Sequence, residues 1–63
     1  MTRAAFRKEV RRQFEALTVG AQAIASQRAL GRQVFWWDGL TLVESRRLLG
    51  AVVRARLIHD EVS

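Results

Sequence analysis

The chain has 63 residues, enough for one small domain, and its lack of cysteine excludes disulfides and thiolate metal sites. Hydrophobic residues make up 49% of it, too many for an intrinsically disordered tail. Eleven basic and six acidic residues give a net charge of +5, which suits a polyanionic partner such as nucleic acid. The apolar runs are too short to span a bilayer and no signal-peptide core is present, so we expect a cytoplasmic protein.

The N-terminal half carries one apolar stripe with steps of three and four residues, which is typical of an amphipathic helix. The stripe comprises Phe6, Val10, Phe14, Leu17, Ala21 and Ile24. It predicts one long helix over about residues 3–30, with Thr2 as its N-cap and Gly31 as its C-terminal stop. The alternative is a break near Gly20, since the preceding Thr18 and Val19 lower helix propensity; this would make a three-helix bundle.

Residues 31–41 form a connector rich in aromatic side chains. Val34 to Trp37 is β-prone, and Asp38-Gly39 is a turn sequence, so a two-stranded hairpin is one interpretation. Against it, Thr41 and Glu44 have the spacing of a capping box, which predicts that a helix begins at about residue 42. We therefore expect an extended connector followed by a helix over about residues 42–61.

The predicted second helix is apolar on two sides. One side carries Leu42, Leu49, Val53 and Leu57, and the other carries Leu48, Val52, Ala55, Ile58 and Val62. One partner helix from the same chain covers a single side, and a chain this short is only marginally stable alone. The sequence therefore predicts a homodimer with a four-helix core, in which Leu48, Val52, Ala55 and Ile58 meet another chain.

Charges at the helix ends favour an antiparallel hairpin. Arg3, Arg7 and Lys8 crowd the start of the first helix, whereas Asp60 and Glu61 lie at the end of the second. Both groups have the wrong sign for their own helix dipole. In an antiparallel hairpin these two ends lie side by side, so that the charges compensate each other.

A row of basic residues flanks the apolar stripe of the first helix and is the candidate nucleic-acid-binding surface. It comprises Arg3, Arg7, Lys8, Arg11 and Arg12. Guanidinium groups that recur every four residues line up along a helix and suit successive phosphates. Glu9 and Glu15 reduce the net charge of this face, since Glu15 is spaced to pair with Arg11 and Arg12.

A second arginine group, in the helix over residues 42–61, is a weaker candidate. It comprises Arg46, Arg47, Arg54 and Arg56. Helical spacing predicts that Arg47 pairs with Glu44 and that Arg56 pairs with Asp60.

Phe35, Trp36 and Trp37 have the chemistry to stack on bases, to anchor a protein partner or to enter a membrane interface. Aromatic residues beside a helix turn more often close the end of a helical core. Neighbouring residues of an extended segment point in different directions, so we expect at least one of Trp36 and Trp37 to stay exposed and to be the binding residue.

Catalysis has little support in the sequence. Most carboxylates have arginine neighbours, no glycine-rich phosphate loop is present, and His59 has no partner at catalytic spacing. We therefore expect neither an enzyme nor a bound cofactor or metal.

The leading prediction is a small regulatory or architectural protein whose arginine-rich helix face binds nucleic acid. The alternative is a protein-interaction module, an adaptor or inhibitor that uses the second apolar side of its last helix and the Trp-Trp connector. A peripheral membrane binder is a third possibility.

Overall fold

The computed structural model describes residues 2–62, with the side chains of residues 2–58. Within this range the chain forms three α-helices, α1 (Arg3–Glu15), α2 (Val19–Leu30) and α3 (Leu42–Val62), and a short 3-10 helix, η1 (Trp37–Gly39). No strand occurs in the described range. The predicted all-α fold class is therefore confirmed.

The predicted unbroken helix over residues 3–30 is wrong, because the helix stops at Glu15 and restarts at Val19. Thr18 has an extended backbone, and its hydroxyl accepts a hydrogen bond from the backbone N–H of Ala21 at 3.2 Å. Thr18 is thus an N-cap, which stabilises a new helix start. The break lies just before Gly20, near the position of the alternative prediction, and Gly20 itself belongs to the first turn of α2.

Local capping sets the other helix ends. Thr2 caps α1 by accepting from the backbone N–H of Ala5 at 3.1 Å. Gly31 ends α2 in the left-handed conformation, with φ 69°, which glycine adopts at little cost. At α3 the predicted capping box is formed, since Glu44 Oε1 accepts from Thr41 N at 3.0 Å and Thr41 Oγ1 accepts from Glu44 N at 3.1 Å.

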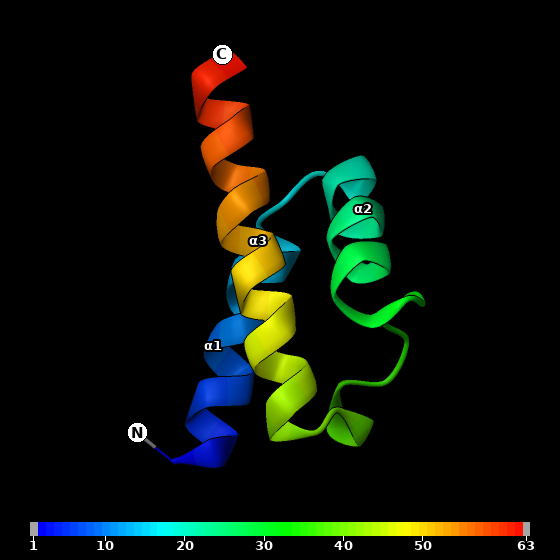
Figure 1. Cartoon of the computed structure of the whole chain (residues 1–63). Helices are drawn as coiled ribbons and strands as arrows, with labels where there is room; N and C mark the ends of the chain where they lie inside the picture. Colours follow the sequence, from blue (N-terminus) through cyan, green and yellow to red (C-terminus); the bar gives the residue numbers. More distant parts are fainter. Residues whose placement is uncertain (1, 63) are drawn as a thin grey trace.

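The helices α1 and α3 run in roughly the same direction, and α2 runs opposite to them (Figure 1). The first turns of α1 lie near η1, just before α3 begins, because Ala4, Arg7 and Lys8 line one hollow with Trp37 and Asp38. The start of the first helix was predicted to lie beside the end of the last helix, as in an antiparallel hairpin. This prediction is therefore wrong. The break at Thr18 reverses the chain one helix earlier than expected. The side chains of Asp60 and Glu61 lie outside the described residues.

The core lies where α1 and α2 both pack against α3 (Figure 1). Its buried hydrophobic residues are Val10, Phe14, Ala25, Leu40, Leu48 and Val52. Leu48 and Val52 are 0% exposed, so the prediction that they meet another chain is wrong. Two helices of the same chain cover that side of α3, whereas the prediction allowed for only one.

Outside this core, the later turns of α3 stay in contact with solvent. Val53, Leu57 and Ile58 are all exposed, and Ala55 is half-buried. Of the four residues predicted to meet a partner, only Ile58 and, in part, Ala55 are accessible. Among the described residues, no helix combines the length and the apolar character that crossing a membrane requires.

Candidate nucleic-acid interface

Ion pairs within α1 occupy part of the predicted basic row. The Arg11 guanidinium lies 2.9 Å from the Glu15 carboxylate, as the spacing predicts. Arg12, however, pairs with Glu9 one turn earlier and not with Glu15. Among the described side chains, no carboxylate pairs with Arg3, Arg7 or Lys8.

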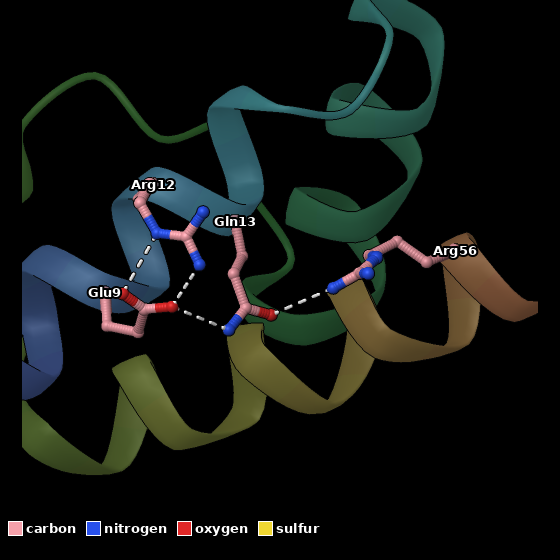
Figure 2. Close-up of polar contacts among 4 residues, drawn as sticks. All are labelled: Glu9, Arg12, Gln13 and Arg56. Carbon is pink, nitrogen blue, oxygen red and sulfur yellow. Dashed lines mark hydrogen bonds and ion pairs between the residues drawn. The ribbon is translucent and has the colours of Figure 1, made fainter.

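A polar network extends from this row to α3 (Figure 2). The Gln13 amide donates to Glu9 Oε1 at 3.1 Å, and its oxygen accepts from Arg56 at 3.5 Å. The hydrogen bond from Arg12 and then that from Gln13 lower the pKa of Glu9 from 4.5 to about 2. The Glu9 carboxylate therefore stays ionised near neutral pH and partly cancels the charge of the row.

Trp37 is partly buried against the core, beside the basic row. Its ring meets Phe14 edge-on, with centroids 5.3 Å apart, and the Arg11 guanidinium lies 5.8 Å from the Trp37 ring centroid. Both contacts are favourable aromatic geometries. Trp37, Asp38 and three basic residues of α1 line a small hollow of about 210 Å³. This end of the row thus combines cations with a carboxylate.

A larger groove with a more uniform charge runs between α2 and α3. It has a volume of about 450 Å³ and is lined by Arg28, Ala29, Arg46, Arg47, Gly50, Ala51 and Arg54. All four arginines are exposed, and no carboxylate lines the groove. None of the four forms an ion pair with another described side chain. We call this site the arginine groove.

The carboxylate of Glu44, which lies near Arg47 in the sequence, points towards the connector and not into the arginine groove. This carboxylate accepts from Thr41 N and lies 2.9 Å from the Arg32 guanidinium. The hydrogen bond from Thr41 is the main cause of the lowered pKa of Glu44. The predicted pair between Glu44 and Arg47 is therefore not formed.

The sequence contains a partial indication of this groove. Arg46, Gly50 and Arg54 recur every four residues, so they share one face of α3, and Gly50 keeps the middle of that face open. A Cβ at Gly50 would meet nothing within 4 Å. The contribution of Arg28 was missed because it depends on α2 packing against α3.

An apolar hollow of about 390 Å³ continues from the arginine groove along α2 and α3, sharing Arg28 and Ala51 with it. Its other lining residues are Ala21, Ile24, Ala25, Ala55 and Ile58. Ala55 and Ile58 therefore belong to this surface, whereas Leu48 and Val52 belong to the core. The predicted partner-binding set is thus divided between two places.

Two of the three connector aromatics are exposed. Phe35 is 85% exposed and Trp36 is 73% exposed, whereas Trp37 is half-buried against Phe14. Of the two predicted binding tryptophans, Trp36 is the one that is accessible.

Comparison with protein-family models, with curated proteins and with solved structures finds no match to this chain. Within the described residues, no group of three or more His, Cys, Asp or Glu side chains is arranged to hold a metal ion.

Proposed function

We propose that the protein binds nucleic acid through the arginine groove between α2 and α3. The supporting observation is that four exposed arginines line one concave surface without a carboxylate among them. A guanidinium group donates two parallel hydrogen bonds to a phosphate, and each neutralised phosphate releases counterions. Four such groups in one groove suit the repeated charge of a polynucleotide backbone.

The basic row of α1 takes a supporting part in this proposal. Arg11 and Arg12 are held by Glu15 and Glu9, so only part of the row is available for phosphates. Arg3 and Lys8 are exposed and carry no ion pair among the described side chains. They add long-range electrostatic attraction for the phosphate backbone.

The test compares two double variants that remove the same net charge. Arg46→Gln with Arg54→Gln removes groove arginines, and Arg3→Gln with Lys8→Gln removes α1 cations. Binding of a labelled oligonucleotide is followed by fluorescence anisotropy over a range of salt concentrations. The slope of the logarithm of the association constant against the logarithm of the salt concentration is negative. The groove variant should reduce its magnitude by about two, one for each lost phosphate contact.

The α1 variant should change that slope by much less. Equal losses in the two variants would contradict the groove as the main site. Absence of binding by the wild-type chain at low salt would contradict nucleic-acid binding altogether.

Association with another chain is a second candidate function, because the apolar hollow and the outer side of α3 stay accessible. Ile24, Leu57 and Ile58 are each more than half exposed. The homodimer predicted from sequence would bury such residues. Light scattering should then give the mass of two chains for the wild type and of one chain for Leu57→Gln. A wild-type mass of one chain at every concentration would contradict the dimer.

A further inference from the structure

We infer that the arginine groove takes a single strand of nucleic acid, whose bases stack on Phe35 and Trp36 of the connector. This inference rests on the proposed function and specifies its ligand. Both aromatic residues are more than 70% exposed, although large aromatic surface in water is unfavourable. Trp37, the next residue, instead packs within the chain against Phe14.

Trp36 is positioned by its own backbone. It has an extended conformation, with φ −139° and ψ 97°, and its carbonyl accepts from Gly39 N at 3.3 Å. A Cβ at Gly39 would lie 3.5 Å from Cδ1 of the Trp36 indole, so the indole lies close to the glycine backbone. The ring is thus supported on one side while most of its surface stays open. A supported open ring suits base stacking, because little freedom is lost on binding.

The connector that carries Phe35 and Trp36 joins the two helix ends that lie nearest in the chain to three of the groove arginines. The connector leaves the end of α2, where Arg28 is in the last turn, and leads into the start of α3, which carries Arg46 and Arg47 (Figure 1). The ion pair between Arg32 and Glu44 ties the connector to the first turn of α3. In our proposal, a backbone that lies in the groove continues along the connector towards the exposed rings.

This combination favours a single strand over a duplex. Paired and stacked bases do not offer their faces to an aromatic ring, whereas a single strand does, for every base type. The longest dimension of the molecule is 33 Å. At the duplex rise of about 3.4 Å per nucleotide, about ten nucleotides would span it, and an extended single strand would need fewer.

The experiment uses the full chain with single-stranded and double-stranded DNA of about twelve nucleotides, at one low salt concentration. Wild type should bind the single strand more tightly, and binding should quench tryptophan fluorescence. Trp36→Ala should weaken single-strand binding about tenfold or more, since stacking contributes about 1–3 kcal/mol per base, and should leave duplex binding unchanged. Trp36→Phe should retain most of the affinity, because it keeps an aromatic face.

The outcomes separate the inference from the proposed function. Equal binding of both DNA forms, unchanged by Trp36→Ala, would overturn the stacking role while nucleic-acid binding would stand. No binding of either form would overturn both. Circular dichroism checks that each variant is folded, and Phe35→Ala provides a second, independent substitution in the same aromatic pair.

Discussion

At the scale of single residues, Glu9 joins two helices through side chains. It pairs with Arg12 and accepts from Gln13, which in turn accepts from Arg56 of α3 (Figure 2). Sequence spacing predicted the pair between Arg11 and Glu15 because both lie on one helix. It did not predict that Arg12 pairs with Glu9, since Glu9 and Glu15 both lie three residues from Arg12. The contact between Gln13 and Arg56 depends on tertiary packing.

Because the pKa of Glu9 is low in the folded state, the stability of the fold depends on pH. Because this pKa falls from 4.5 to about 2 on folding, the ionised group stabilises the fold above pH 4.5. That contribution is lost as the pH falls from 4.5 through about 2. The melting temperature of wild type should therefore drop more steeply across this window than that of Glu9→Gln. Melting temperatures that fall by the same amount in the two proteins between pH 5 and about pH 2 would contradict this linkage.

At the scale of helices, the break between α1 and α2 shows what periodicity can and cannot predict. The apolar stripe keeps its phase across residues 16–18, so spacing alone predicted one continuous helix. The hydrogen bond from Ala21 N to the Thr18 hydroxyl was not anticipated, although the low helix propensity at Thr18 and Val19 suggested a break. The capping box of Thr41 and Glu44 was predicted because its spacing is a local property of the chain.

Removing the cap should weaken the fold. Thr18→Ala leaves a backbone N–H of the first turn of α2 without its side-chain acceptor and should lower the free energy of unfolding by about 1 kcal/mol. Thr18→Ser keeps the hydroxyl and should restore most of the loss. Urea denaturation of the three proteins measures the difference. An unchanged free energy in Thr18→Ala would show that the cap is not needed for the break.

At the scale of the whole molecule, the two apolar sides of α3 were visible in the sequence, but the occupant of each side was not. That choice depends on the reversal at Thr18, which brings α1 and α2 to the same helix. The arginine groove has the same origin, since Arg28 and Arg54 are 26 positions apart in the chain and meet only through helix packing. Patterns on single helices therefore predicted the basic row of α1 and an arginine group on α3, but not the groove that Arg28 completes.

The packing of α1 against α3 joins segments that are far apart in the order of synthesis. Val10 and Phe14 leave the ribosome well before Leu48 and Val52, the α3 residues with which they share the core. Until α3 exists, the apolar face of α1 has no lasting cover from its own chain. We therefore expect the apolar face of this basic helix to be exposed to solvent during that interval. Because α3 follows α1 in the chain, this exposure ends only when α3 has been made and has packed against it.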